Sequence, residues 1–423
     1  MLDRSLPSPV VFKYHLYRAA AGPGFIYPIY VLYLLSQGLS FAHIGVIGAV
    51  QSVIVVGGEL PTGYVGDRIG RRNSLLVGQA LFAAASVGFV VGSSFPAFLV
   101  AFALLSFGGT FVSGSGDAWL YDSLEERLDG SRFTHVRGRG AAVGQWVTAV
   151  TMVLGGVLYV VDPVLPFLAL LVMRLATFGV VLTMPKTAQY ADDAESEASG
   201  ADLTVLDAVP IIREELLRPP LRSFVAYMAL FLGVLVTVDA FIQPIAVDGL
   251  EATVGEHLAA FGVPEAAVLG VLYASFTAVS AVASDRASDL VSLLGLRRAV
   301  LVVPFVTAVL MALPALLPLL AFPMFFGVKA ANSVLEPVAG QYVNDHVDSV
   351  GRATVLSAVA MVYALARVPF TLGSGVIGDV VSPLAAVAAM GATFLVGGTV
   401  FVLLWPPVGA TAVDGTPAGT TTD

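Results

Sequence analysis

The chain has 423 residues, of which 57% are hydrophobic and 12% charged, with a formal net charge of −9 at pH 7. Because soluble domains carry about a quarter charged residues, this composition excludes a water-soluble globular protein and predicts a membrane protein. The chain has no cysteine, which excludes disulfides, thiol catalysis and thiolate metal sites.

Twelve apolar segments follow one another along the chain. A helix needs about 20 apolar residues to span a hydrocarbon core of about 30 Å, because its backbone polar groups must be satisfied internally. The expected spans are 16–37, 43–66, 74–93, 97–121, 140–161, 164–184, 223–246, 265–284, 299–318, 320–343, 353–377 and 383–405. Several of these segments are broken by Gly or Pro, which neighbouring helices can accommodate in a membrane. The predicted fold class is an all-α membrane protein. No cleavable signal precedes the first span, so we expect that span to target the chain.

The stretch GYVGDRIGRR (63–72), between the second and third spans, is unusually polar for its place. It resembles the loop 2–3 signature of the major facilitator superfamily, roughly G-x-x-x-D-R-x-G-R-[KR]. The number of spans and the long central loop agree with that family over nearly the full length. The resemblance implies a transporter with twelve transmembrane helices in two six-helix halves.

In such transporters this stretch forms a cytoplasmic gate, and the resemblance assigns that role to Gly63, Gly66, Asp67, Arg68, Gly70, Arg71 and Arg72. The glycines permit a tight turn and close backbone approach. We expect Asp67 to face the N-terminus of the helix that starts near Ala353, since the helix dipole favours negative charge there. Arg68 or Arg71 is expected to pair with Asp122. Plain positive charge on a cytoplasmic loop is the alternative, and it explains neither Asp67 nor the glycines.

A weak internal repeat supports two halves. ASDRASDLVSLLGLRR (283–298) is a longer echo of the gate stretch, with Asp285 and Arg286 matching its Asp-Arg pair and two further arginines at its end. Asp345 ends the tenth span and Arg352 opens the eleventh, as Asp122 and Arg139 bracket the equivalent loop between spans 4 and 5. Ordinary interfacial charge is the alternative for these residues.

Lysines and arginines set the orientation. The chain has 21 of them, and three, Arg174, Lys329 and Arg367, lie within spans. The other 18 fall on one side when the spans alternate. The positive-inside rule then places both termini and the central loop in the cytoplasm of a multi-pass cell-membrane protein. The expected divisions are an N-terminal half at 1–184, a linker at 185–222 with an amphipathic helix, a C-terminal half at 223–405, and a disordered tail at 406–423.

Charges within the spans need a reason, because each costs about 2.5–3.5 kcal/mol at the bilayer centre. The candidates are Glu59, Asp117, Arg174, Asp239, Lys329, Glu336 and Arg367. Helical spacing groups them into polar stripes: Ser113, Asp117 and Tyr121; Asp239 and Gln243; Lys329, Asn332 and Glu336; Tyr363, Arg367 and Thr371. In the family, helices 1, 4, 7 and 10 line the cavity, so the resemblance places Asp117, Asp239, Lys329 and Glu336 there.

Several alternatives stay open for these charges. Glu59 either lines the cavity or braces the gate, and Arg174 either lines it or is a structural ion-pair partner. Lys329 is expected to pair with Asp117 or Asp239, and Glu336 with Arg367 or a proton. The fifth span has Gly155-Gly156 but lacks the Gly-Pro pair of the family's drug/proton antiporters, which leaves that activity open.

The function expected is secondary active transport of a small solute by alternating access, by a monomer. The energy is expected to come from a proton or ion gradient, or from the gradient of the solute itself. The sequence predicts no cofactor, no metal site and no nucleic-acid partner, and it leaves the solute and the direction open. A transporter-like sensor or a polytopic membrane enzyme is the alternative, although no catalytic motif is visible.

Overall fold

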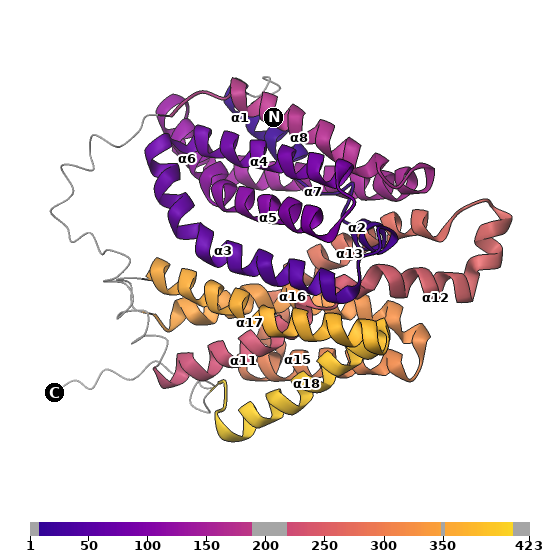
Figure 1. Cartoon of the computed structure of the whole chain (residues 1–423). Helices are drawn as coiled ribbons and strands as arrows, with labels where there is room; N and C mark the ends of the chain where they lie inside the picture. The colour runs from indigo at the N-terminus through magenta and orange to yellow at the C-terminus, as the bar shows by residue number, and fades with distance from the viewer. Residues whose placement is uncertain (1–7, 188–217, 348–351, 409–423) are drawn as a thin grey trace, which may run out of the picture. The chain divides into compact units, whose positions relative to one another are not determined.

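The computed structural model describes residues 8–187, 218–347 and 352–408, and every regular element in these ranges is a helix (Figure 1). The first group comprises α1 (Pro9–Ala20), α2 (Tyr30–Ser36), α3 (Phe41–Ile69), α4 (Arg71–Val91), α5 (Phe95–Val112), α6 (Ser115–Arg127), α7 (Phe133–Val161) and α8 (Leu165–Thr183). The second comprises α11 (Pro219–Val236), α12 (Asp239–Ala260), α13 (Glu265–Asp285), α14 (Ala287–Leu294), α15 (Leu296–Ala312), α16 (Ala321–Asp345), α17 (Arg352–Val380) and α18 (Pro383–Leu404). The expected linker helix and the tail beyond 408 lie outside the described residues.

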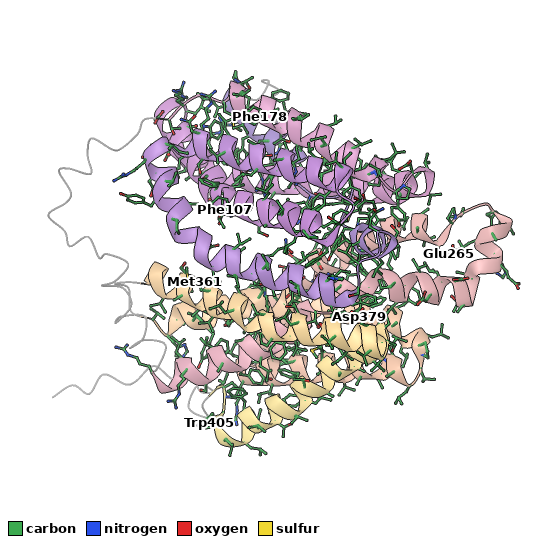
Figure 2. The ribbon with its side chains drawn as sticks, in the orientation of Figure 1. Phe107, Phe178, Glu265, Met361, Asp379 and Trp405 are labelled. Carbon is green, nitrogen blue, oxygen red and sulfur yellow. The ribbon has the colours of Figure 1, made fainter. Side chains whose placement is uncertain are left out.

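Eleven stretches of the described residues are long and apolar enough to cross a membrane. They correspond to the second through twelfth expected spans, so the all-α membrane fold is confirmed. Many large apolar side chains remain exposed, among them Phe107 and Trp405, which are labelled in Figure 2. Such a surface is suited to lipid, because hydrocarbon tails accept it where water does not.

Contacts divide the chain into two compact units. The first takes in residues 1–202 and 246–277, and the second residues 203–245 and 278–423. In the first unit α4 packs against α5 and α8, while α1 lies against α7 and α8. In the second unit α11 packs against α17 and α18, and α15 packs against α18. α12 and α13 each contribute to both units, and the expected limits at 184 and 223 stay predictions.

The first expected span is not one continuous helix. α1 ends at Ala20 and α2 begins only at Tyr30, with Gly-Pro-Gly at 22–24 in the break. A Cβ on Gly24 would lie 1.9 Å from the Thr151 hydroxyl of α7, so the chain approaches α7 more closely than another residue allows. Proline lacks the N–H that would continue the helix. The expected span over 16–37 is therefore broken at this Gly-Pro-Gly.

Side chains of α8 satisfy the carbonyls that this break exposes. Arg174 donates from Nη1 to the Ala21 carbonyl at 2.7 Å, and Thr177 donates to the Ala20 carbonyl at 3.2 Å. The Arg174 side chain is 3% exposed, and its guanidinium lies 4.8 Å from the centre of the Phe82 ring. Among the described residues Arg174 has no acidic partner, so the expected ion pair is replaced by a carbonyl and an aromatic face.

Two further spans are interrupted beside an acid. The fourth breaks at Ser113–Gly114, where Gly114 has φ +73° and α6 starts at the next residue. The seventh breaks between α11 and α12. Asp117 and Asp239 consequently lie in the first turns of α6 and α12, where the helix dipole favours a negative charge. The expected stripe of Ser113 with Asp117 on one helix is wrong, because the break separates them.

The end of α8 is held by cations and an indole from three other helices. Five carbonyls each accept a hydrogen bond, the pairs being Arg72 to Val181 and to Leu182, Lys13 to Thr183, Trp119 to Pro185, and Arg127 to Lys186. The last four carbonyls of a helix have no partner within it. Here α1, α4 and α6 supply donors to this end of the first unit.

Candidate functional site

The stretch GYVGDRIGRR is mostly helical rather than a loop. α3 continues to Ile69, Gly70 makes the turn, and α4 begins at Arg71. Gly70 has φ 86° and ψ 149°, a conformation that only glycine adopts without strain. A Cβ on Gly66 would lie 3.1 Å from the Ser74 hydroxyl, whereas one on Gly63 would meet no atom within 4 Å. The expected glycine requirement thus holds for the turn at Gly70 and does not extend to Gly63.

Asp67 forms an ion pair with Arg71 across this turn, and both side chains are exposed, by 62% and 39%. The Arg68 guanidinium lies 4.3 Å from the centre of the Tyr64 ring. The expected pair with Asp122 is not formed: within the described ranges Asp122 has no ion pair, because Arg71 is taken by the nearer Asp67. Whether Asp67 faces the start of α17 concerns both units and stays a prediction.

Arg72 points elsewhere from its neighbour Arg71. Its Nε donates to the Val181 carbonyl at 3.2 Å and its Nη2 to the Leu182 carbonyl, both at the end of α8. Sequence reasoning missed this role. Successive helical residues point about 100° apart. Two adjacent arginines at a helix start are therefore expected to have different partners, and this spacing was the signal in the sequence for a separate role of Arg72.

The echo in the second half has the same backbone turn. Gly295 separates α14 from α15 with φ 77° and ψ 147°, close to the values at Gly70. Two arginines, Arg297 and Arg298, lie in the first turn of α15 as their counterparts lie at the start of α4. Asp285 and Arg286 form an ion pair at 3.8 Å with exposed side chains. The weak sequence repeat therefore corresponds to a repeated helix–glycine–helix junction.

Asp117 is engaged by two partners in the first unit. Arg137 of α7 donates from Nε to its Oδ2 at 2.8 Å, and Tyr14 of α1 donates from its hydroxyl to Oδ1 at 3.0 Å. Sequence reasoning missed both partners, since it counted Arg137 only as a cytoplasmic charge. A Cβ on Gly140 would lie 2.6 Å from the Tyr14 ring, so this glycine lets α1 approach α7 closely enough for the contact.

The remaining predicted gate residues lie at helix ends or on exposed faces. α16 ends at Asp345 and α17 begins at Arg352, as expected, with residues 348–351 outside the described ranges. Arg139 lies exposed on α7. Glu59 is half-buried on α3 and has no ion pair within the part of the chain that the structure describes. Their proposed roles stay predictions.

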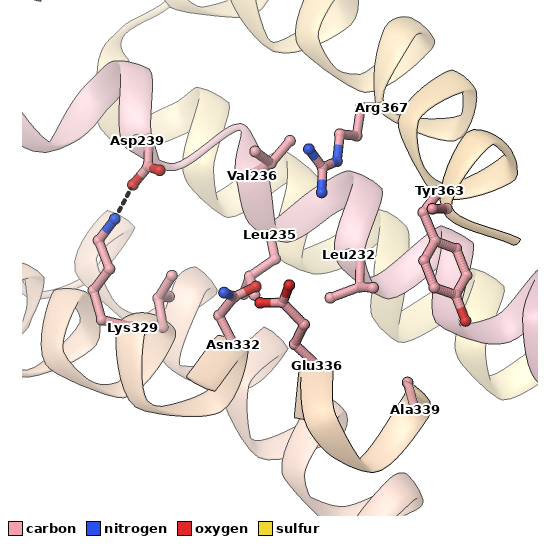
Figure 3. A pocket seen from close by; sticks show the side chains of 12 residues that line it. Leu232, Leu235, Val236, Asp239, Lys329, Asn332, Glu336, Ala339, Tyr363 and Arg367 are labelled. Carbon is pink, nitrogen blue, oxygen red and sulfur yellow. Dashed lines mark hydrogen bonds and ion pairs between the residues drawn. The ribbon is translucent and has the colours of Figure 1, made fainter. Parts of the chain in front are cut away.

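A cavity of about 270 Å³ in the second unit brings most of the predicted polar residues together (Figure 3). Four helices line it through Leu232, Leu235 and Val236 of α11, Asp239 of α12, Val328, Lys329, Asn332, Glu336 and Ala339 of α16, and Ala360, Tyr363 and Arg367 of α17. Gln243 is fully buried on α12 and is not among the lining residues. Thr371, the third member of the expected stripe on α17, donates to backbone carbonyls of its own helix and is not among the lining residues.

One charge pair in this cavity is closed. Lys329 of α16 and Asp239 of α12 form an ion pair, with 16% and 34% of the side chains exposed (Figure 3). Asp239 is one of the two acids that the sequence named as partners for Lys329. Because Asp239 also opens α12, its carboxylate is stabilised by both the helix terminus and the ammonium group.

The second charge pair is open. Glu336 is exposed to the cavity, and within the described residues neither it nor the Arg367 side chain has an ion pair. Figure 3 shows the Arg367 guanidinium and the Glu336 carboxylate facing one another, and Glu336 and Asp239 are the acids whose charges act on Arg367. The Nε of Arg367 and the hydroxyl of Tyr363 are covered and lack hydrogen-bond partners. Two donors of α17 thus remain unused in the described structure.

The family model of the Major Facilitator Superfamily matches residues 19–371 of the chain. The protein belongs to this family, and it is therefore a membrane transporter and not an enzyme. The uncharacterized MFS-type transporter YxaM of Bacillus subtilis (strain 168) is 25% identical over 197 residues, which is 46% of each chain. The match thus spans less than half the length of that relative.

Solved transporters share the fold. The crystal structure of the nucleoside transporter NupG has a TM-score of 0.76 at 12% identity, covering 93% of this chain and 98% of that one. The crystal structure of the D-xylose-proton symporter has a TM-score of 0.65 at 14% identity, covering 96% of this chain and 99% of that one. At such identities the likeness concerns the fold alone.

Proposed function

We propose that the protein is a secondary active transporter that moves a small solute across the cell membrane by alternating access. It acts as a monomer with both termini in the cytoplasm. The observation that carries this proposal is the cavity of the second unit, which holds one closed and one open charge pair against an apolar wall. Charged side chains in membrane spans are costly, and those that face a cavity commonly mark substrate or ion pathways.

The cavity supplies both parts of a solute site. Leu232, Leu235 and Val236 form an apolar wall that offers water no hydrogen bonds. The polar side chains of α16 and α17 fix the orientation of the solute. Binding pockets for small molecules combine these features, and a volume of about 270 Å³ lies just below the usual range of about 300–1,000 Å³. A solute of modest size fits this description.

Energy comes from a proton or another ion, and Glu336 is the better proton carrier of the two acids considered. Asp117 is already engaged by Arg137 and Tyr14. Glu336 lacks an ion pair among the described residues and is exposed to the cavity. The D-xylose-proton symporter, a structural relative, offers an analogy for coupling but no evidence on the solute.

The gate stretch controls access from the cytoplasm. The turn at Gly70 fixes how α3 continues into α4, and Asp67 and Arg71 lie exposed beside it. Exposed charges of opposite sign are available for exchange between partners, since a surface pair is worth only about 0–1 kcal/mol. We assign the gate to Asp67, Arg68 and Arg71, and give Arg72 a role in holding α8.

Reconstitution tests this proposal. The purified full chain is screened for ligands by thermal shift, and each stabilising compound is then tested for uptake into liposomes with and without a pH gradient. We expect saturable uptake that a protonophore diminishes. A compound that stabilises the protein but is never taken up would favour the sensor alternative, whereas uptake that ignores every ion gradient would remove the coupling and leave facilitated diffusion.

A further inference from the structure

The open charge pair carries information about the solute. Arg367 lines the cavity and its guanidinium has no ion pair among the described residues, whereas the lysine that shares the cavity is already bound to Asp239. A guanidinium that faces a cavity without an ion pair is suited to a ligand that supplies an acceptor of opposite charge. The cavity is therefore incomplete at Arg367.

The chemistry of the two groups decides which one yields to a ligand. An arginine side chain does not lose its proton in proteins, so Arg367 stays cationic throughout. Glu336 is exposed to the cavity and becomes neutral by taking one proton from solvent. A cationic ligand at Glu336 would always face the charge of Arg367. An anionic ligand at Arg367 faces the charge of Glu336 only until that carboxylate is protonated.

The charged and titratable groups around Glu336 are few. α17 contributes Arg367 and Tyr363, α12 contributes Asp239, and α16 itself contributes Lys329, while α11 contributes only apolar side chains to the cavity. Since Lys329 and Asp239 neutralise one another, the charge balance at Arg367 depends on Glu336.

We propose that the solute carries a carboxylate that binds the guanidinium of Arg367, and that Glu336 takes up one proton when this carboxylate binds. The inference rests on the proposed transport function and adds the class of its substrate. Guanidinium and carboxylate match in geometry and form two parallel hydrogen bonds. One bound anion and one added proton leave the net charge of the cavity unchanged, so the two travel together without moving charge.

Binding of three matched probes tests the inference. Benzoate, benzamide and benzylamine share a ring and differ in the charge of one substituent. Saturation-transfer NMR on the full chain in lipid nanodiscs reports weak binding of each. We expect benzoate to bind and the other two to bind at least about tenfold more weakly. Preference for benzylamine, or equal binding of benzoate and benzamide, overturns the proposal.

The pH dependence tests the role of Glu336. Carboxylic acids with a pKa of about 4 stay ionised from about pH 6 to about pH 8, so any change in this range comes from the protein. We expect wild-type benzoate binding to strengthen by up to about tenfold for each unit that the pH is lowered, as linkage to one proton requires. Glu336→Gln should bind benzoate tightly at both values. A variant that keeps the wild-type pH dependence overturns this part.

Variants of Arg367 separate recognition from folding. Arg367→Gln should weaken benzoate binding about tenfold or more, and Arg367→Lys should recover part of it because the charge remains. Thr371→Val, one turn away and outside the cavity, is the matched control. If Arg367→Gln does not fold, the comparison of the three probes on the wild type still decides. Benzoate binding without flux of any carboxylate would refute the transport function and leave the carboxylate site supported. Flux of a solute that lacks a carboxylate, without benzoate binding, would refute the carboxylate site and leave the transport function supported.

Discussion

Gly70 and Gly295 adopt the same backbone conformation at corresponding places in the two units, with φ and ψ of 86° and 149° in one and 77° and 147° in the other. Each glycine ends one helix and starts the next, and two arginines lie in the first turn that follows it. An L-residue in this region of φ/ψ space costs about 1–3 kcal/mol.

Alanine at either glycine should therefore lower stability. We expect Gly70→Ala and Gly295→Ala each to reduce the free energy of unfolding by about 1–3 kcal/mol, because the Cβ is strained by its own backbone. Thermal unfolding in detergent measures the effect. Gly63→Ala is the control, since its Cβ would meet nothing within 4 Å and alanine favours the helix. A Gly63→Ala variant as unstable as the other two would refute the argument from backbone strain.

The ion pair of Lys329 and Asp239 should show strong coupling. Lys329→Ala leaves a carboxylate without its cation, and we expect a loss of about 3 kcal/mol because breaking a desolvated pair costs about 3–5 kcal/mol and Asp239 is partly exposed. Lys329→Ala combined with Asp239→Asn should recover most of the stability but not transport. Equal melting of the single and double variants would show that Asp239 is already well solvated. Ser333→Ala, on the same helix, provides the baseline.

Arg174 should be required for the break in the first span. We expect Arg174→Met to lower stability by about 2–4 kcal/mol, since the Ala21 carbonyl loses its donor and Phe82 loses its cation. Arg174→Lys should recover only part, because an ammonium lacks the planar face. Thr177→Val should cost less, as Thr177 also bonds within its own helix. An Arg174→Met protein of wild-type stability would mean that desolvating the cation costs as much as its contacts contribute.

Asp67→Asn should separate folding from transport. The pair with Arg71 is exposed, so its loss should change stability by no more than about 1 kcal/mol. Transport should nevertheless be largely abolished if Asp67 belongs to the gate. Flux per reconstituted molecule is the readout, with Asp285→Asn as the counterpart in the repeat. Wild-type flux in Asp67→Asn would remove the gate assignment.

Labelling of single cysteines tests the orientation. Ser131 and Thr253 are both exposed, and the chain has no native cysteine to confuse the result. We expect Ser131→Cys to react only with reagent on the cytoplasmic side and Thr253→Cys only with reagent outside. Reaction of both from the same side would contradict the alternating topology.

Most of the spans could be predicted because lipid imposes a simple condition on them. A backbone in hydrocarbon must satisfy its own polar groups, so each crossing is a long apolar helix that hydropathy reveals. That several spans are broken by Gly or Pro could be predicted, but the position of each break could not, because distant residues decide it. The Ala21 carbonyl is satisfied by Arg174, 153 positions away. Nor does anything local mark Gly114, among several nearby glycines, as the one with positive φ.

The candidate site was predictable to a similar degree. Helical periodicity placed Lys329, Asn332 and Glu336 on one face, and all three line the cavity. Pairing was harder, because charges on different helices meet only after packing has set their distance. Asp117 illustrates this: its two partners, Tyr14 of α1 and Arg137 of α7, come from two other helices, and Gly140 leaves room for the Tyr14 ring against α7.

Five carbonyls at and just beyond the end of α8 accept hydrogen bonds from other helices, and this has a mechanical consequence. Residues 181–186 are fastened to α1, α4 and α6 at once, so tension arriving along the chain beyond Lys186 is shared among three helices. We therefore expect α8 to resist unravelling from this end. Arg72, at the start of α4, bears part of that load, so a pull on the following chain reaches the junction at Gly70 directly.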